Sequence, residues 1–354
     1  MNTLCERLII LSLIIIILPA IAMSGGAQES ALPKVVVVTT GGTIAMKYDP
    51  VTGGVVPAVS GKDLIAAVPG LAKIARIETC EFSNIDSSQM TPEMWRRLSA
   101  KVQQILEQED VKGVVVTHGT DTIAEGAFFL ETTLVSTKPV VFVGAMRSAS
   151  ELSPDGPANI YNAVLQVCAA EAQTWGVTVT MNQFINSARH VRKDETTNVQ
   201  TFDSGEYGFL GYIVADRVIP FNTVWLKQKL PLPDSLPRVP YITTFAGDDG
   251  SLIRYVVDRG AKGLVVEGVG AGNVNKDVFA AIEYALAKAV PVVVASRVRR
   301  GGVYALYGDT GGGSSLVKAG AFLAGDLSPY KARLLLMIAL AQPGMTKARL
   351  RTLF

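Results

Sequence analysis

Short, continuous runs of apolar and β-branched residues recur along this chain, and stretches with helical spacing separate them. Most of these runs do not alternate apolar with polar residues, which is typical of parallel strands covered on both faces. The runs expected to form strands are residues 35–39, 113–117, 140–143, 177–181, 241–245, 263–267 and 292–295. The helices expected are 123–134, 157–173, 277–288, 329–341 and one that begins at Pro92, with Thr91 as its N-cap. This alternation predicts an α/β doubly wound fold with a mainly parallel sheet.

A proline-rich segment divides the chain unequally. Residues 227–240, "KQKLPLPDSLPRVP", hold four prolines and show no periodicity, which is typical of a boundary between domains. A chain of 354 residues is long enough for two domains with substantial cores. We therefore predict a large N-terminal α/β catalytic domain at 34–226, a linker at 227–240 and a smaller C-terminal α/β domain at 241–354.

The charge of the chain is nearly balanced, with 33 basic and 31 acidic residues. This balance gives no reason to expect a nucleic acid or an anionic membrane surface as a partner. The sequence contains no heptad or short repeat, so a fibrous structural protein is not favoured either.

The N-terminus carries an apolar run at residues 8–22, which Arg7 precedes. The run is shorter than the roughly 20 residues that span a bilayer, and residues 20–22 (Ala-Ile-Ala) form a small-x-small pattern. These features predict a secretory signal peptide at 1–22 and a periplasmic location for the mature protein, with no membrane contact after cleavage. An uncleaved membrane anchor is the alternative, because Glu6 offsets the charge of Arg7.

Two cysteines, Cys80 and Cys168, remain once Cys5 leaves with the signal peptide. In an oxidising compartment they could pair, but two free thiols are an equal alternative, because the sequence does not show how close their Cα atoms lie. Neither cysteine has the spacing of a metal ligand.

Glycine and polar residues follow three of the expected strands at the point where each strand ends. Gly42 and Thr43 follow strand 35–39, Gly119-Thr120-Asp121 follows strand 113–117, and "GAMR" follows strand 140–143. Ligands of open parallel sheets bind beyond the carboxyl ends of the strands, and glycine lets the backbone approach a ligand closely. The paired threonines therefore indicate a site, although either threonine alone is equally consistent with an ordinary strand residue or helix N-cap.

The possible nucleophiles narrow the chemistry of such a site. The chain has two histidines, His118 and His190, and no G-x-S-x-G motif, so a serine or cysteine enzyme with a histidine base is not favoured. A threonine nucleophile needs a different base, and a partly desolvated lysine can serve, because burial favours the neutral amine. Lys193 lies in the polar segment "ARHVRKDETT" after strand 177–181; its alternative is a solvated loop lysine.

Nucleotide binding is the competing interpretation. The segment 265–273, "VVEGVGAGN", imitates a G-x-G-x-x-G loop, but Asn273 or Asn275 stands at the third glycine in the two possible registers. The chain also contains no G-x-x-x-x-G-K-[ST] loop. A phosphate-binding role is therefore not favoured.

Seven segments, taken in order, resemble the bacterial L-asparaginases of the asparaginase/glutaminase family. They are "TTGGTIA", "VVVTHGTDTIAE", "VGAMR", "SPDGPANIYNA", "RHVRKDETTNVQTF", "GVGAGN" and "GDLSPYKARLLL". The resemblance covers the chain from about residue 33 to its end, and the signal peptide makes it similar to the periplasmic type.

The resemblance implies hydrolysis of L-asparagine to L-aspartate and ammonia through a covalent acyl-enzyme, with no metal or organic cofactor. Thr43 matches the primary nucleophile. Thr120 would position or activate the attacking group, and Lys193 would be the base for Thr120. Asp121 would bind the substrate α-ammonium and support the lysine. The family also implies a homotetramer with sites between paired subunits.

The same resemblance assigns the groups that hold the substrate. Ser87 would donate to the α-carboxylate, the Ala145 carbonyl would accept from the amide nitrogen, and Asn273 would reach the site from a neighbouring subunit. Backbone N–H groups at the glycine turns are expected to stabilise the oxyanion. The substrate-binding residues implied are Gly42, Ser87, Ser88, Gly119, Thr120, Asp121, Ala145 and Asn273.

The sequence departs from the family pattern at three places. A loop tyrosine that usually contacts the nucleophile aligns with Gly54 or Val55, and Tyr48 is expected to replace it. Ser88 stands where a glutamine is usual, which leaves the preference between asparagine and glutamine open. A glutamate of some exported members is missing near "RRGGVYALYGDTGGG", where Tyr304, Tyr307 and Asp309 stand instead.

These departures keep a second hypothesis open, which is a periplasmic binder of asparagine or aspartate that retains the pocket and has little or no turnover. An enzyme that prefers glutamine is a milder variant of the first hypothesis. Turnover of the two amides separates all three.

Overall fold

One large sheet forms where the buried apolar runs lie side by side. The computed structural model describes residues 32–224 and 229–354, so the predicted signal peptide at 1–22 and residues 225–228 lie outside the described residues. The strand order is β12-β11-β8-β7-β6-β5-β1-β4, parallel from β4 to β7 and antiparallel from β7 to β12. The strands are β1 Lys34–Gly41, β4 Arg76–Ile85, β5 Val111–Thr117, β6 Val140–Val143, β7 Val177–Met181, β8 Phe184–Ser187, β11 Gly211–Val214 and β12 Arg217–Pro220.

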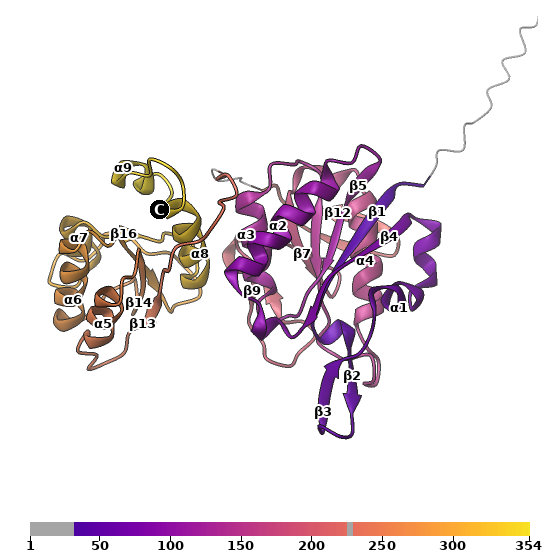
Figure 1. Cartoon of the computed structure of the whole chain (residues 1–354), viewed down its shortest axis with the longest axis horizontal. Helices are drawn as coiled ribbons and strands as arrows, with labels where there is room; N and C mark the ends of the chain where they lie inside the picture. The colour runs from indigo at the N-terminus through magenta and orange to yellow at the C-terminus, as the bar shows by residue number, and fades with distance from the viewer. Residues whose placement is uncertain (1–31, 225–228) are drawn as a thin grey trace, which may run out of the picture. The chain divides into compact units, whose positions relative to one another are not determined.

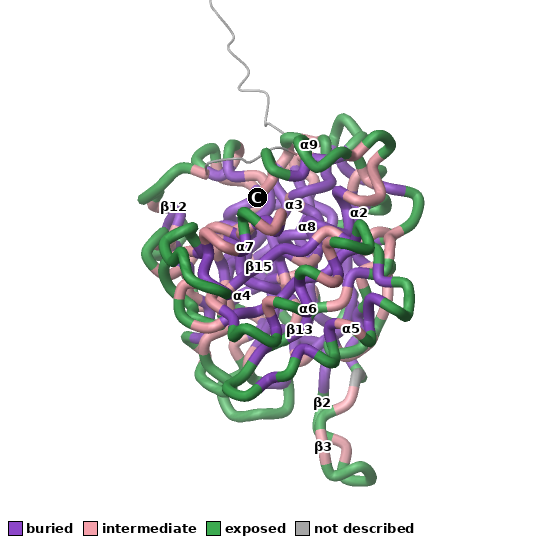
Figure 2. The backbone as a smooth tube through the Cα atoms, turned by 90° about the vertical axis from the view of Figure 1, so that its left-hand side faces the viewer, coloured by how far each residue is buried: buried purple, intermediate pink, exposed green. Residues whose placement is uncertain are grey.

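Helices cover both faces of this sheet, with α2 and α3 on one face and α1 and α4 on the other (Figure 1). They are α1 Gly61–Ala66, α2 Pro92–Leu106, α3 Ile123–Thr133 and α4 Gly156–Cys168. The central valines, such as Val37 and Val115, are fully buried between these layers, and Figure 2 shows such buried backbone in purple. The doubly wound, mainly parallel architecture is therefore confirmed.

A second, smaller sheet occupies the C-terminal part, with four parallel strands in the order β13-β14-β15-β16. Helices α5, α6 and α7 lie on one side of it and α8 lies on the other (Figure 1). The strands are β13 Tyr241–Thr243, β14 Leu264–Gly268, β15 Val292–Ser296 and β16 Phe322–Leu323. The helices are α5 Ser251–Asp258, α6 Lys276–Ala287, α7 Gly313–Ala319, α8 Pro329–Leu340 and α9 Lys347–Arg351. The smaller C-terminal α/β part is thus also confirmed.

Two short antiparallel ribbons and five 3-10 turns complete the described structure. The ribbons pair β2 Met46–Asp49 with β3 Gly54–Pro57 and β9 Arg192–Lys193 with β10 Phe202–Asp203. The 3-10 turns are Thr43–Ala45, Pro69–Lys73, Ser87–Gln89, Glu171–Thr174 and Gly205–Tyr207. No helix or strand forms between Lys229 and Pro240, and the division of the chain at this segment stays a prediction.

Several expectations about single elements were wrong. The helix expected at 157–173 ends at Cys168, because Ala169 has extended backbone angles and a separate 3-10 turn follows. The strand expected at 241–245 ends at Thr243. Strand β4 was missed because it lies at the sheet edge, where exposed residues interrupt its apolar positions.

Cys80 and Cys168 are both half-buried free thiols.

In the part of the chain that the structure describes, no helix has the length and apolar character needed to cross a bilayer.

Candidate functional site

The predicted strand ends meet at one edge of the large sheet. Thr39 on β1 pairs in register with Thr117 on β5, and Thr117 pairs with Val143 on β6. The segments that follow these three residues therefore leave the sheet side by side, as expected for parallel strands.

The glycines of these segments bring the backbones into contact. A Cβ on Gly42 would overlap the Cα and N atoms of Gly119, and a Cβ on Gly119 would lie 2.5 Å from Ser87 Oγ. A Cβ on Gly144, at the end of β6, would lie 3.0 Å from Thr120 Cγ2. Side chains larger than hydrogen would push these segments apart. The residues around Thr43, Thr120, Ser87 and Ala145 thus converge because glycine allows it.

The Gly42→Ala variant is expected to lose at least about 2 kcal/mol of unfolding free energy, and activity with it. Gly42 has φ 85°, so alanine there is strained by about 1–2 kcal/mol, and its methyl group would also clash with Gly119. Gly53→Ala is the matched control, because Gly53 has φ 68° and a Cβ there meets nothing within 4 Å. Urea unfolding of both variants checks this; equal losses would mean that the contact between the two glycines contributes nothing.

Lys193 reaches Thr120 and Asp121 at the same time. Its Nζ donates to Thr120 Oγ1 at 3.0 Å and to Asp121 Oδ1 at 2.7 Å. Thr120 is buried, whereas the side chains of Lys193 and Asp121 are 20% and 59% exposed. The lysine is therefore not a solvated loop residue, and it joins a hydroxyl and a carboxylate at the end of β5.

The short ribbon of β9 and β10 carries this lysine. Lys193 pairs with Phe202, whose ring is buried, and the next residue, Asp194, donates its backbone N–H to Thr201 O at 2.8 Å. The amino group of Lys193 thus projects from an anchored backbone toward the end of β5.

Thr43 begins the 3-10 turn that follows Gly42 and is half-buried. The next residue, Ile44, is buried and packs against Gly156 at the start of α4, which fixes the turn. Among the residues that the structure describes, no hydrogen-bond partner is found for the Thr43 hydroxyl. Its oxygen is therefore available to a ligand at this sheet edge.

Ser87 and Ser88 lie in the turn that follows the edge strand β4. Ser87 is buried, and its carbonyl accepts from Thr122 Oγ1 at 2.8 Å, which ties this turn to the start of α3. Ser88 is exposed, and its backbone N–H is held by Asp86 Oδ1 at 2.7 Å. Of the two serines, Ser87 is the one that lies against the glycine contact.

The turn that contains Ala145 depends on a carboxylate that the sequence analysis did not single out. Asp155 accepts the backbone N–H groups of Met146 and Arg147 at 3.0 and 2.9 Å, and it also accepts from the Asn159 amide at 3.1 Å. The Asn159 amide in turn donates to Gly144 O at 3.0 Å. The available indication was the position of Asp155 directly before Gly-Pro at the start of a helix.

The ring of His118 holds the segment Gly119-Thr120-Asp121 in place through a hydrogen bond to its backbone. Its Nε2 accepts from Trp95 Nε1 at 3.3 Å, and since an indole N–H only donates, the ring hydrogen must be on Nδ1. Nδ1 then donates to Gly119 O at 2.8 Å. Burial lowers the pKa of His118 from 6.5 to about 4, so the ring is neutral and structural at neutral pH.

The unfolding free energy is expected to decrease as the pH decreases, because of His118. The unfolded chain binds a proton at this histidine below pH 6.5, whereas the folded protein does so only below about pH 4. The contribution, about 3 kcal/mol, is therefore complete above pH 6.5 and is lost progressively as the pH falls from 6.5 to about 4. Urea unfolding at pH 7 and 4.5 should show a smaller decrease for His118→Gln than for the wild-type protein; the same decrease in both would contradict this origin.

Two predicted residues lie apart from this cluster. Tyr48 is on the ribbon of β2 and β3, the residue is 57% exposed, and its backbone N–H donates to Ser150 Oγ at 2.8 Å. Asn273 follows β14 in the C-terminal part and bridges to Val269 in its own loop; its Oδ1 is buried without a partner among the described residues. Their roles stay predictions.

Acidic, histidine and cysteine side chains do not converge into a metal-binding group of three or more anywhere in residues 32–224 and 229–354.

Known proteins match this chain along nearly its whole length. Residues 34–225 match the family model "Asparaginase, N-terminal", and residues 238–354 match "Glutaminase/Asparaginase C-terminal domain". "L-asparaginase 2" of Escherichia coli is 37% identical over 92% of this chain and 94% of that protein. "Probable L-asparaginase periplasmic" of Haemophilus influenzae is 38% identical over 89% of this chain and 91% of that protein.

A solved structure agrees with these matches. The crystal structure of a probable cytoplasmic L-asparaginase from Campylobacter jejuni has a TM-score of 0.82 and 39% identity, and covers 90% of this chain and 98% of that chain. The resemblance inferred from the motifs is thereby confirmed. By motifs, fold and overall similarity, this chain belongs to the asparaginase family.

Proposed function

We propose that this chain is an L-asparaginase, an amidohydrolase that converts L-asparagine to L-aspartate and ammonia with Thr43 as its nucleophile. Relatives named L-asparaginase at 37% and 38% identity support the activity. The main support for placing the active site here is that Lys193 contacts both Thr120 and Asp121. The turn that begins with Thr43 lies beside them. A buried hydroxyl held by an amine suits proton transfer.

The reaction has two halves. In the first, Thr43 Oγ forms a bond to the amide carbon, the carbon–nitrogen bond breaks, and ammonia leaves with the hydroxyl proton. In the second, water adds to the resulting ester, the bond to Thr43 Oγ breaks, and aspartate leaves. The pair of Thr120 and Lys193 moves the proton in each half. Backbone N–H groups at the glycine turns stabilise the oxyanion, each by about 3 kcal/mol.

The substrate is held by its charged ends. Asp121 binds the α-ammonium group, which its exposed carboxylate can reach, and Ser87 donates to the α-carboxylate. Ala145 supplies its carbonyl to the amide nitrogen, on the turn that Asp155 fixes. Tyr48 takes the place of the loop tyrosine that contacts the nucleophile in the family.

We further propose a periplasmic homotetramer in which Asn273 completes the site of a neighbouring subunit. The apolar run at 8–22 and the periplasmic relative of Haemophilus influenzae support export, although the structural relative from Campylobacter jejuni is described as cytoplasmic. Light scattering of the purified mature protein tests the tetramer, and a monomer that retains full activity would contradict it.

The decisive experiment is the release of ammonia from L-asparagine and from L-glutamine by the purified protein. Turnover of L-asparagine is the expected result, and it excludes the non-catalytic binding protein. Tight binding of aspartate in a calorimeter, with no product over hours, would overturn the proposal. The ratio of kcat/KM on the two amides decides whether L-glutamine is also a substrate.

A further inference from the structure

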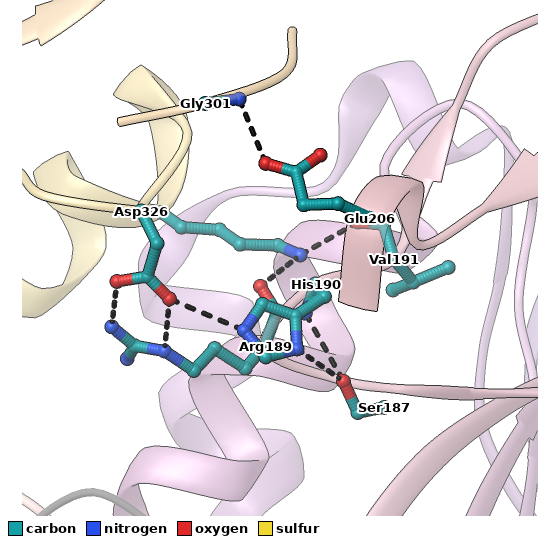
Figure 3. Close-up of polar contacts among 8 residues, drawn as sticks. Ser187, Arg189, His190, Val191, Glu206, Gly301 and Asp326 are labelled. Atoms are coloured by element: carbon teal, nitrogen blue, oxygen red, sulfur yellow. Dashed lines mark hydrogen bonds and ion pairs between the residues drawn. The ribbon is translucent and has the colours of Figure 1, made fainter. Parts of the chain in front are cut away.

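Side chains of the C-terminal part hold the segment that leads into Lys193. Asp326 accepts two hydrogen bonds from the Arg189 guanidinium, at 2.6 and 2.8 Å. The same carboxylate accepts from His190 Nε2 at 3.2 Å, while Nδ1 of that ring lies 3.1 Å from Ser187 Oγ. Figure 3 shows Arg189 and His190 turned toward Asp326. Two consecutive side chains are thus fixed by one carboxylate that lies 136 and 137 positions further along the chain.

Lys331 fixes the backbone of the same segment. It is fully buried on α8, and its Nζ donates to the carbonyls of Arg189 at 2.8 Å and Val191 at 2.6 Å. Each of these carbonyls accepts a hydrogen bond from the amino group of Lys331, whose pKa is lowered well below its usual value by burial. Val191 is buried and stands two positions before Lys193, so the amino group of Lys331 sets where the β9 strand begins.

The segment is also held just after Lys193. Arg299, in the loop after β15, donates to Asp194 Oδ1 at 2.7 Å and to the Asp194 carbonyl at 3.3 Å. In the same region the backbone N–H of Gly301 donates to Glu206 Oε1 at 2.7 Å, which Figure 3 also shows. The C-terminal part therefore holds the backbone on both sides of Lys193: Asp326 and Lys331 before it, and Arg299 after it.

We propose that Lys331 is a positioning residue for Lys193: with Asp326 before Lys193 and Arg299 after it, the C-terminal part holds the β9 backbone so that the amino group of Lys193 meets Thr120 and Asp121. This inference rests on the proposed function, in which Lys193 moves the proton. A side chain that acts at 3.0 Å from Thr120 Oγ1 depends on its backbone, because a displacement of about 1 Å can lower a rate by about 10²-fold.

Lys331→Met tests this role, since methionine fills similar space without the amino group that donates to the two carbonyls. We expect kcat for L-asparagine to fall on the order of 10²-fold, with KM within about 3-fold of the wild type. Arg333→Met is the matched control, because Arg333 is a partly buried cation on the same helix that donates to a carbonyl, that of Val239, away from this segment. Its kcat should stay within about 3-fold of wild type, whatever its Tm.

A double-mutant cycle separates positioning from general destabilisation. In a Lys193→Met background, Lys331→Met should lower the residual kcat by less than about 2-fold, because its effect passes through Lys193. A full additional loss there would overturn the proposal, and so would wild-type kcat in folded Lys331→Met. If Lys331→Met does not fold, Arg299→Gln carries the test, because the Arg299 side chain is 61% exposed; kcat should fall about 5-fold at unchanged Tm, and unchanged kcat would count against the role.

The two proposals can fail separately. If Lys193→Met keeps wild-type kcat, the proposed function has the wrong proton carrier, whatever Lys331→Met does. If Lys193→Met loses activity while Lys331→Met and Arg299→Gln keep it, the positioning role alone is wrong.

Discussion

The Lys193→Met variant is expected to release ammonia from L-asparagine about 10²–10⁴-fold more slowly than the wild-type protein. Methionine keeps the length and apolar stem of the lysine but leaves Thr120 Oγ1 and Asp121 Oδ1 without the donor that holds them at 3.0 and 2.7 Å. The loss should appear in kcat, because the amine transfers the proton during the reaction. KM should change little, because the exposed Asp121 remains to bind the α-ammonium. Steady-state measurement of ammonia release gives both kcat and KM.

The control for this variant is a lysine with similar geometry elsewhere. Lys288 donates to Asp258 Oδ1 at 2.8 Å on the surface of the C-terminal part, so Lys288→Met removes one charge and one ion pair. Its kcat should match that of the wild type. Equal activity in Lys193→Met and Lys288→Met would show that the contact with Thr120 has no part in the chemistry.

The Thr43→Ala variant is expected to lose activity by about 10⁴-fold or more, the largest effect of any single substitution proposed. The change deletes the hydroxyl that forms the ester, whereas Thr43→Ser keeps an oxygen on the same turn and should retain measurable turnover. Ile44 and Gly156 anchor the turn, so the fold should survive. Unchanged thermal unfolding of Thr43→Ala, measured beside the assay, establishes that survival.

Because Lys193 contacts Thr120 directly, Thr120 is the other possible nucleophile. The position of the ester distinguishes the two threonines. Intact-mass and peptide spectrometry after rapid acid quenching should place the aspartyl group on Thr43, and it should accumulate in Thr120→Ala. An aspartyl group found on Thr120, or its persistence in Thr43→Ala, would reverse the assignment of the two threonines.

Residues near the sheet edge show how far the sequence leads. The runs around Val37 and Val115 predict buried parallel strands, because no polar residue interrupts them, and parallel strands must end at a common edge. That rule predicts that Thr43 and Thr120 lie in one region. The edge strand β4 and the antiparallel strands β8, β11 and β12 were not predicted, because short or half-exposed strands lack such continuous apolar runs.

The supporting residues of the site were much less predictable. Trp95 and Lys331 lie 23 and 140 positions from the groups that they hold, and Asp155, although only 4 to 9 positions from its partners, belongs to a residue type that usually has a simple local role. Only the contacts assign them: Asp155 to the turn of Met146, Trp95 to the His118 ring, and Lys331 to the Val191 carbonyl.

The sequence by itself determined the fold class, the family and the strand ends where a site belongs, because apolar periodicity and glycine placement are local properties written along the chain. The tertiary structure alone decided the distances from Lys193 to Thr120 and Asp121, which the resemblance only paired, and it alone decided that Gly42 lies against Gly119 and that α8 holds the lysine's backbone. Those relations join residues 72 to 140 positions apart, and their distances depend on how sheet and helices pack, which no local pattern encodes.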